Sequence, residues 1–313
     1  MGRWRSLSIC RVNPEVVLKN SDYKNLSRYV SSYLGSLKSH SVEINDQEWN
    51  YLDGGQGETI LFLHGLAGSK VLWRSLMQSY INDYRVIAVD IPGLFVEQRF
   101  IGRKHTYREL ANWLELFLEH LQIDKLHIVG HSSGSCVSSC FASTRPSMVE
   151  SVTLLNHHDV LSDDAVGHPS TVLNTVLDAT NEEGWEDFQK KLFYSPPAMP
   201  KFVQRYRLRS MLKHKEGFVQ VVQDLAELRP MAMSYLRKIK CPVLTVNGSH
   251  DIFSPLEFHR SLKSQIPWGE HVLIERCGHA SFLEKPDDIL AIHKSFLDSV
   301  KEGAESLEYG AGI

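Results

Sequence analysis

Three side chains in this sequence have the types and the order that nucleophilic catalysis by a serine requires. Ser132 lies in the pentapeptide Gly130-His131-Ser132-Ser133-Gly134, directly after the apolar run 126–129. A turn of the form G-x-S-x-G between a strand and a helix exposes the serine hydroxyl and leaves the next backbone N–H free to bind an oxyanion. The pattern therefore predicts that Ser132 is a nucleophile.

A base and an acid follow downstream. A serine hydroxyl is a weak nucleophile at neutral pH, so it needs a neighbouring base that is itself oriented by a carboxylate. Asp251 follows the apolar run 243–246, and His279 follows the run 271–274. The chain order Ser, Asp, His, with each residue after a strand, predicts His279 as the base and Asp251 as its partner. Three other carboxylates could replace Asp251, although helix capping is their simplest role: Asp159, Asp163 and Asp164.

A second turn predicts an oxyanion-binding site. It has the sequence His64-Gly65-Leu66-Ala67-Gly68-Ser69 and follows the apolar run 59–63. Its glycines allow the backbone to approach a substrate closely. We expect the backbone N–H groups of Leu66 and Ser133 to bind the oxyanion of a tetrahedral intermediate. Residues around these turns are the expected substrate contacts: His64, Gly65, His131 and Phe95.

The elements that must position these residues are repeated strand–helix units. The expected strands lie at 41–46, 48–53, 59–63, 84–90, 125–132 (with the serine turn), 151–155, 243–246 and 271–274. The expected helices lie at 70–80, 106–121, 135–144, 255–264 and 286–300. Continuous apolar runs are typical of strands that are covered on both faces. The alternation predicts the α/β class, with a mostly parallel sheet and helices on both faces.

The chain is expected to form one α/β core that is interrupted by a helical insertion. Residues 157–236 show no strand pattern, and the spacing predicts helices at 170–179, 185–193, 202–212 and 217–228. An all-helical insertion after a strand is where a cap or lid over the active site would lie. Residues 1–40 are the expected N-terminal extension, and residues 41–156 with 237–300 are the expected core. The cap is expected at 157–236 and a flexible tail at 301–313.

Amphipathic and charged segments leave alternatives open. A helix expected over 22–38 could lie on a membrane surface, cover a substrate entrance or pack on its own domain. The apolar face of the helix at 217–228 could line the substrate pocket or pack on the sheet. The cations between Lys201 and Lys215 could attract anionic lipid or acidic substrates, or form a solvated helix face.

The composition excludes several classes of function. With 34 Lys and Arg against 37 Asp and Glu, the net charge is −3, which argues against a nucleic-acid partner. The five cysteines are scattered, and the spacing of Cys136 and Cys140 is typical of helix packing rather than of a metal site. We therefore expect no metal and no other cofactor. The lack of a secretory signal or an 18-residue apolar stretch predicts a cytoplasmic protein, which could associate peripherally with a membrane.

Taken together, the motifs make residues 40–300 resemble the serine esterase and lipase branch of the α/β-hydrolase superfamily. The matching motifs are His64-Gly65-Leu66, Asp90-Ile91-Pro92-Gly93, Gly130–Gly134, Asn247–Asp251, and Gly278-His279 followed by Glu284-Lys285-Pro286. Residues 192–203 also resemble the cap of monoacylglycerol-lipase-like hydrolases. A serine at 132 differs from the epoxide hydrolase and haloalkane dehalogenase branches, which have Asp there. The sequence departs from the family at Leu94-Phe95-Val96, where small or polar residues are usual.

The resemblance implies a serine hydrolase that cleaves carboxylic esters through an acyl-enzyme intermediate, without a cofactor. Apolar acyl esters and monoacylglycerol-like lipids are the expected small-molecule substrates. One alternative is hydrolysis of a C–C, lactone or thioester bond by the same triad, which product analysis would distinguish. The other is a ligand-binding receptor of the same fold, which slow turnover with tight product retention would indicate.

Overall fold

The computed structural model describes residues 35–45, 47–94, 106–157, 179, 181–214, 219–221, 224 and 234–310 of the 313-residue chain. Several sequence-based predictions lie outside these residues. They are the N-terminal extension up to residue 34, the helix expected over 170–179 except for residue 179, most of the helix expected over 217–228, the substrate contact Phe95, and the alternative carboxylates Asp159, Asp163 and Asp164.

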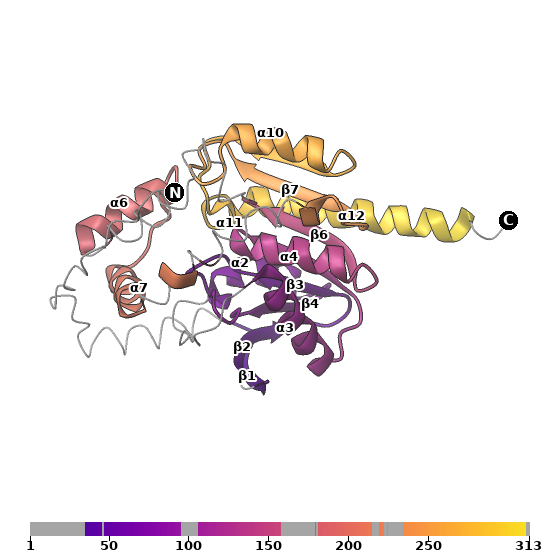
Figure 1. Ribbon diagram of the computed structural model, residues 1–313, viewed down its shortest axis with the longest axis horizontal. Coiled ribbons are helices and arrows are strands. Elements are labelled where there is room, and N and C mark those ends of the chain that lie inside the picture. Colours follow the sequence, from indigo (N-terminus) through magenta and orange to yellow (C-terminus); the bar gives the residue numbers. More distant parts are fainter. Residues whose placement is uncertain are drawn as a thin grey trace.

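An eight-stranded sheet with the order β1-β2-β4-β3-β5-β6-β7-β8 forms the centre of the molecule (Figure 1). The strands are β1 (Lys38–Ile44), β2 (Gln47–Gly54), β3 (Thr59–Leu63), β4 (Arg85–Val89), β5 (Leu126–His131), β6 (Val149–Leu155), β7 (Val243–Gly248) and β8 (Glu270–Ile274). Strand β2 runs antiparallel to β1 and β4, whereas the other neighbours are parallel. The predicted α/β class with a mostly parallel sheet is confirmed.

The register of the central strands places the candidate turns together. Every residue of β3, β5 and β7 is buried, as expected for strands that are covered on both faces. Leu63 at the end of β3 is paired with Gly130 in β5. The turn that contains Leu66 and the turn that contains Ser132 therefore leave the same edge of the sheet side by side.

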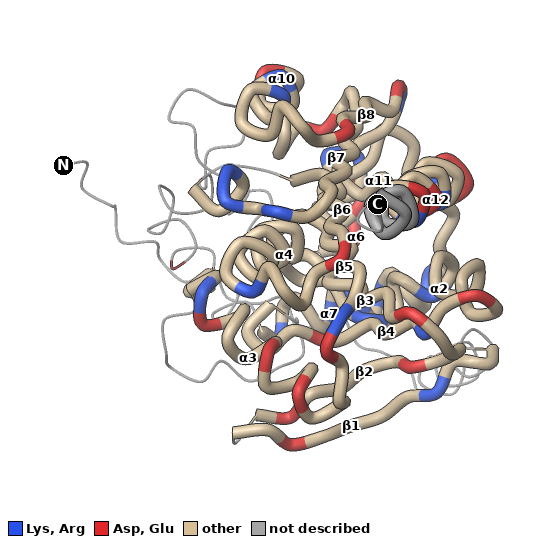
Figure 2. The backbone as a smooth tube through the Cα atoms, turned by 90° about the vertical axis from the view of Figure 1, so that its right-hand side faces the viewer, with Lys and Arg blue, Asp and Glu red and all other residues tan. Residues whose placement is uncertain are grey.

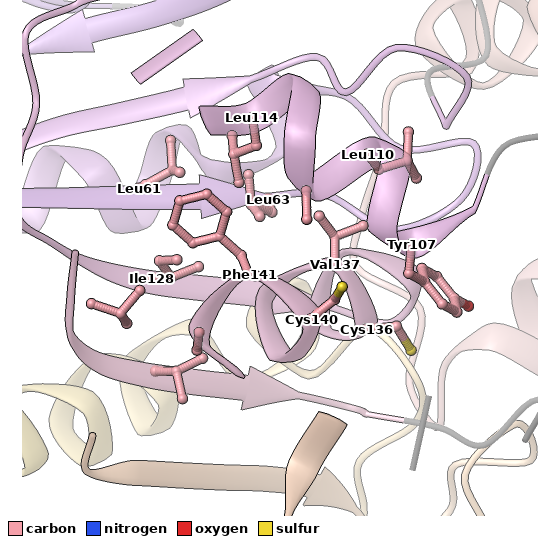
Figure 3. Close-up of a cluster of buried hydrophobic side chains, with 14 of the residues drawn as sticks. Leu61, Leu63, Tyr107, Leu110, Leu114, Ile128, Cys136, Val137, Cys140 and Phe141 are labelled. Carbon is pink, nitrogen blue, oxygen red and sulfur yellow. The ribbon is translucent and has the colours of Figure 1, made fainter. Parts of the chain in front are cut away.

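Helices cover both faces of the sheet, which Figure 2 shows edge-on. One face carries α3 (Tyr107–His120), α4 (Ser133–Thr144) and α10 (Leu256–Gln265). The other face carries the 3-10 helix η1 (Lys70–Trp73), α2 (Arg74–Tyr80), α11 (Ser281–Glu284) and α12 (Pro286–Gly310). Figure 3 shows part of the first core, where Val137 and Phe141 of α4 lie beside Leu63 of β3.

Helix α4 is almost entirely buried although it is rich in serine. Its hydroxyl groups find acceptors within the helix, as when Ser138 Oγ donates to Gly134 O at 2.8 Å. Internal pairing of this kind removes most of the cost of burying a hydroxyl. The helix also packs tightly against its own strand, because a Cβ at Gly130 would lie 2.6 Å from Gly134 O.

The described cysteines are free thiols: Cys136, Cys140, Cys241 and Cys277. Burial raises the pKa of Cys140 to about 11 and the pKa of Cys241 and Cys277 to about 12. These three thiols therefore stay protonated at neutral pH and are poor nucleophiles. Cys136 and Cys140 pack in the core beside α3, in agreement with the expected helix packing (Figure 3).

Between β6 and β7 the chain forms helices α6 (Glu182–Leu192) and α7 (Lys201–Lys213), close to two of the expected helices. Their apolar side chains form a small separate cluster, and Leu66 and Ala67 pack against it. Its buried members are Ala179, Trp185, Leu208, Met211 and Leu212. The insertion therefore contacts the turn after β3. Val221, from the expected apolar helix at 217–228, packs in the core of the sheet instead.

Predictions for segments near the two ends of the chain differ from the structure. The helix expected over 22–38 does not reach residue 38, because Gly35 has a φ of 61° and Lys38 already pairs with Asp53 in the first hairpin. The flexible tail expected from residue 301 is helical, because α12 continues to Gly310. Six of the ten residues 301–310 are Glu, Lys, Ala or Leu, which are strong helix formers, so the helix continues past residue 300.

Positive and negative side chains are interspersed along the described chain (Figure 2). Partly buried ion pairs join Arg85 to Asp53 at 2.8 Å and Arg145 to Glu115 at 2.7 Å. Among the described residues, none of the helices combines the length and the apolar character that a bilayer crossing needs.

Candidate active site

Ser132 lies on a strained turn between β5 and α4. Its φ of 54° and ψ of −123° lie in a region that residues other than glycine rarely adopt. Backbone hydrogen bonds hold the turn, because Ser132 N donates to Leu155 O at 3.0 Å and Ser132 O accepts from Ser135 N at 2.9 Å. This is the conformation that the sequence pattern predicts for a nucleophile on a turn at the end of a strand.

Glycines allow neighbouring segments to approach Ser132. A Cβ at Gly65 would lie 2.8 Å from Ser132 Cβ, and a Cβ at Gly134 would lie 2.4 Å from Leu63 O. Side chains do not tolerate such distances, so both positions require glycine. Gly65, one of the expected substrate contacts, is thus packed directly against Ser132.

The side chains of Ser132, His279 and Asp251 form one hydrogen-bonded chain. His279 Nε2 lies 2.8 Å from Ser132 Oγ, and His279 Nδ1 lies 2.9 Å from each carboxylate oxygen of Asp251. All three residues are buried. When Nδ1–H donates to the carboxylate, Nε2 is left with a lone pair that can accept the serine proton. The arrangement can therefore activate the Ser132 hydroxyl for attack on a carbonyl carbon.

Further donors orient the Asp251 carboxylate. Oδ1 accepts from the backbone N–H groups of Phe253 at 2.9 Å and Ser254 at 3.1 Å. Oδ2 accepts from Asn156 Nδ2 at 2.9 Å. These bonds fix the plane of the carboxylate, so that both oxygens face His279.

The backbone N–H groups of Leu66 and Ser133 are the candidate donors to an oxyanion. Ser133 is the first residue of α4, where a helix leaves its N–H groups without an intrahelical acceptor. Leu66 precedes Ala67, whose N–H donates to Leu94 O at 3.0 Å and whose φ of 57° turns the chain. Within the described residues, neither N–H group has an acceptor. Both therefore remain the expected donors to an oxyanion.

His64 supports the loops around the site. It is fully buried, its Nδ1–H donates to Gly65 O at 2.8 Å, and its Nε2 accepts from Ile91 N at 3.0 Å. Burial lowers the pKa of His64, in keeping with a neutral ring. Because both nitrogens bond to the backbone, His64 ties the turn after β3 to the loop after β4. The expected contact of His64 with substrate stays a prediction.

His131 supports the backbone of the catalytic histidine candidate. Its Nε2 lies 2.8 Å from His279 O, and its ring packs against Phe282 at a centroid distance of 4.9 Å. Burial, reinforced by the neighbouring His279, lowers the pKa of His131 to about 3. The neutral ring can donate Nε2–H to the carbonyl of His279. His131, also expected to contact substrate, thus lies where it steadies His279.

Sequence reasoning missed Asn156, which follows β6 at the same edge of the sheet. It is fully buried, and its side chain bonds to Asp251, to Gly278 O and to Ser281. The available signal was its position, because a polar residue directly after a buried strand lies beside the other strand ends.

Sequence reasoning also assigned no role to Glu284. Its carboxylate accepts from the backbone N–H groups of Gly278 at 2.9 Å, Tyr194 at 3.2 Å and Ser195 at 2.6 Å. His279 N in turn donates to Leu192 O at 2.8 Å. The segment 192–195, which we call the strap, is therefore fastened to the loop that carries His279.

Comparison with known proteins now identifies the family. A family model described as "alpha/beta hydrolase fold" matches residues 58–286. The chain belongs to the α/β-hydrolase family. The match extends from β3 to the beginning of α12, so it includes both turns and all three side chains of the hydrogen-bonded chain.

Known relatives include hydrolases with different names. A 2-hydroxy-6-oxononadienedioate/2-hydroxy-6-oxononatrienedioate hydrolase from Paraburkholderia phymatum is 28% identical over 74% of this chain and 84% of its own length. Lipase 1 from Psychrobacter immobilis is 25% identical over 92% of each chain. The crystal structure of a bacterial membrane phospholipase A has a TM-score of 0.81 at 22% identity, covering 90% of this chain and 93% of that one. The structural likeness shows the α/β-hydrolase fold, and the family supports a hydrolase.

Proposed function

We propose that this α/β-hydrolase is a serine hydrolase of carboxylic esters, with Ser132, His279 and Asp251 as its catalytic triad. The observation that carries the proposal is the 2.8 Å contact between Ser132 Oγ and His279 Nε2, continued by the 2.9 Å contacts of Nδ1 with Asp251. The two N–H groups beside Ser132 add the oxyanion donors that the reaction needs.

In the acylation step, His279 takes the proton of Ser132 while Oγ attacks the ester carbonyl carbon. The N–H groups of Leu66 and Ser133 bind the resulting oxyanion, and such donors typically contribute about 3 kcal/mol each. Asp251 stabilises the protonated imidazole. His279 then gives its proton to the leaving alcohol oxygen, and the acyl group stays on Ser132.

In the deacylation step, a water molecule gives a proton to His279 and attacks the acyl carbonyl carbon. The same donors bind the second oxyanion. Collapse of this intermediate breaks the bond to Ser132 Oγ, which recovers the proton from His279, and the carboxylic acid leaves. The scheme requires no cofactor.

We propose apolar acyl esters, including lipid esters, as the substrate class. The support is an apolar cluster of the insertion, in which Leu208 and Met211 of α7 take part and against which Leu66 packs. The names of two similar proteins, a lipase and a membrane phospholipase A, point in the same direction. We assign the insertion the role of a cap over the site.

Peripheral association with an anionic lipid surface would suit such a substrate. Helix α7 contains no acidic residue, and Lys201, Arg209 and Lys213 are exposed on it. Such cations are attracted to anionic lipids. Sedimentation with anionic phosphatidylglycerol vesicles and with uncharged vesicles, at low and high salt, tests this part of the proposal. Binding that changes with neither the salt concentration nor the lipid charge would contradict it.

Hydrolysis of a C–C bond is the second candidate. It is favoured by the Paraburkholderia phymatum relative, which is named for a substrate that is a keto-dicarboxylate rather than an ester. The same triad could attack a ketone carbonyl. Product analysis with ester and keto-acid substrates separates the two reactions.

The proposed function is tested by covalent labelling and by substrate preference. A fluorophosphonate should label the wild-type protein at Ser132 and leave Ser132→Ala unlabelled and inactive. Ser143→Ala, a change on the same helix that removes a hydroxyl donating to Cys140 O at 2.9 Å, is the matched control and should be labelled normally. A panel of esters and monoacylglycerols of graded chain length then defines the acyl group. Full labelling and activity of Ser132→Ala would refute the triad, and ligand binding without turnover would indicate a receptor.

A further inference from the structure

Asn156 occupies a position that connects the separate segments of the site. It follows β6, its backbone N–H donates to Val246 O at 2.7 Å, and its side chain is fully buried. Its φ of 48° lies in the left-handed region. Asn and Asp tolerate this region better than other side chains do.

The amide group of Asn156 uses its two N–H donors and its oxygen. Nδ2 donates to Asp251 Oδ2 at 2.9 Å and to Gly278 O at 3.1 Å. Oδ1 accepts from Ser281 Oγ at 2.6 Å and from Ser281 N at 3.3 Å. A buried amide that is satisfied in this way holds its partners firmly, because water cannot replace a lost bond.

These bonds join segments that no single strand holds together. Asp251 lies on the loop after β7, Gly278 precedes His279 on the loop after β8, and Ser281 begins α11. The two loops also bond to each other directly, since His250 N donates to Cys277 O at 2.9 Å. That bond joins only their backbones, whereas Asn156 bonds to the Asp251 carboxylate itself and to the carbonyl that precedes His279. The angle at which the carboxylate meets the His279 ring should therefore depend on Asn156.

We propose that Asn156 is a positioning residue that sets the geometry of Asp251 and His279. The proposal rests on the proposed function of the triad. Asn156 touches neither substrate nor the reacting atoms; it acts through the carboxylate and through the carbonyl next to His279. Its donors are the essential part, because an acceptor at this place would repel Asp251 Oδ2 and Gly278 O.

Other titratable groups near the triad come from several elements. His131 at the end of β5 contacts His279 O, and Glu284 of α11 accepts from Gly278 N. The Cys277 thiol lies next to Gly278, and burial raises its pKa to about 12. Substitution of Asn156 leaves all of these groups in place, so a change in the pH profile can be assigned to the new residue.

Two substitutions separate the donor role from the backbone role. Asn156→Asp keeps an oxygen for Ser281 and tolerates the positive φ, but its ionised carboxylate offers only acceptors to Asp251 and Gly278. Asn156→Gly keeps the backbone conformation without strain and removes the side chain without adding charge. Asn45 provides matched controls, because it has a φ of 51° in the exposed β1–β2 turn, far from the site. Asn45→Asp and Asn45→Gly should behave like the wild type.

The test compares hydrolysis, fluorophosphonate labelling and thermal melting of the wild type and the four variants, with assays below the lowest melting temperature. We expect Asn156→Gly to lose about 100-fold in kcat with little change in KM, as misplacement of a reacting group does. Asn156→Asp should lose at least as much. Its acid limb in the kcat/KM profile should also move up by about one pH unit, because a second carboxylate favours the protonated His279.

The outcomes distinguish this inference from the proposed function. If the wild type is neither labelled at Ser132 nor active, the proposed function fails, and this inference fails with it. If the wild type is labelled and both Asn156 variants are labelled at the same rate, with the same kcat and the same acid limb, only the positioning role is refuted. A lower melting temperature with unchanged kinetics would also refute it.

Discussion

Removal of the Glu284 carboxylate should loosen the strap and disturb His279. Glu284 is the shared acceptor of three backbone N–H groups, two from the strap and one from Gly278. In Glu284→Ala, the bond from His279 N to Leu192 O remains as a direct link between strap and loop. The strap should therefore shift rather than detach.

The size of the effect depends on which N–H groups water can reach. Hydrogen bonds to a charged group contribute roughly 1.5–3 kcal/mol each, so three buried ones would sum to roughly 4.5–9 kcal/mol. The N–H groups of Tyr194 and Ser195 are exposed, and water replaces the carboxylate there. Only the partly buried N–H of Gly278 loses its partner, so we expect a net loss of about 2 kcal/mol in the free energy of unfolding. For 313 residues the entropy of unfolding is about 0.66 kcal/mol/K, so Tm should fall by about 3 K.

The assay combines thermal melting with ester hydrolysis. We expect kcat/KM to fall by about tenfold, because a small displacement of His279 weakens its contact with Ser132. Glu257→Ala on the exposed side of α10 is the matched control: it removes only a first-turn charge, so it should leave kcat/KM unchanged and lower Tm by about 1 K. If Glu284→Ala melts and reacts like Glu257→Ala, the strap does not position His279, and the reasoning is wrong.

Acidification should destabilise the fold, because burial lowers the pKa of three histidines to about 3: His131, His157 and His293. In the unfolded chain these groups titrate near 6.5, so the unfolded state binds more protons as the pH falls below 6.5. Tm should fall steadily from pH 6.5 towards pH 4, less steeply in His293→Gln, and a constant Tm over that range would contradict the burial argument. Gly278→Ala should abolish most of the activity, because its Cβ would lie 2.6 Å from Leu192 O in the strap. Gly303→Ala, whose Cβ meets nothing within 4 Å, should keep full activity and stabilise α12 by up to about 1 kcal/mol, and equal activity of the two variants would refute the close approach at Gly278.

Residues that a local sequence motif identifies could be predicted. Ser132 follows a buried strand and opens a helix, and glycines lie on both sides of it, as the nucleophile turn requires. Asp251 and His279 could be found because the carboxyl ends of parallel strands meet at one edge of a sheet. Their hydrogen-bonded contact in the structure agrees with that expectation.

The orientation of the supporting residues could not be predicted. His64 and His131 are next to the predicted turns, and the sequence placed both against substrate. In the structure their rings bond to backbone groups of distant segments, Ile91 N and His279 O. A side chain can point along either side of a turn, and only packing by remote parts of the chain selects one side.

The sequence by itself determined the α/β class, the nucleophile turn and the order of the three polar residues, because each depends on local periodicity and on the chain direction of parallel strands. Tertiary structure decided how the three segments meet. Asn156 joins two loops that lie 95 and 122 residues further along the chain, and Glu284 fastens the strap from 89 and 90 residues away. The sequence around Asn156 or Glu284 does not reveal such contacts, since the role of a buried amide or carboxylate depends on the distant groups that lie next to it in the folded chain.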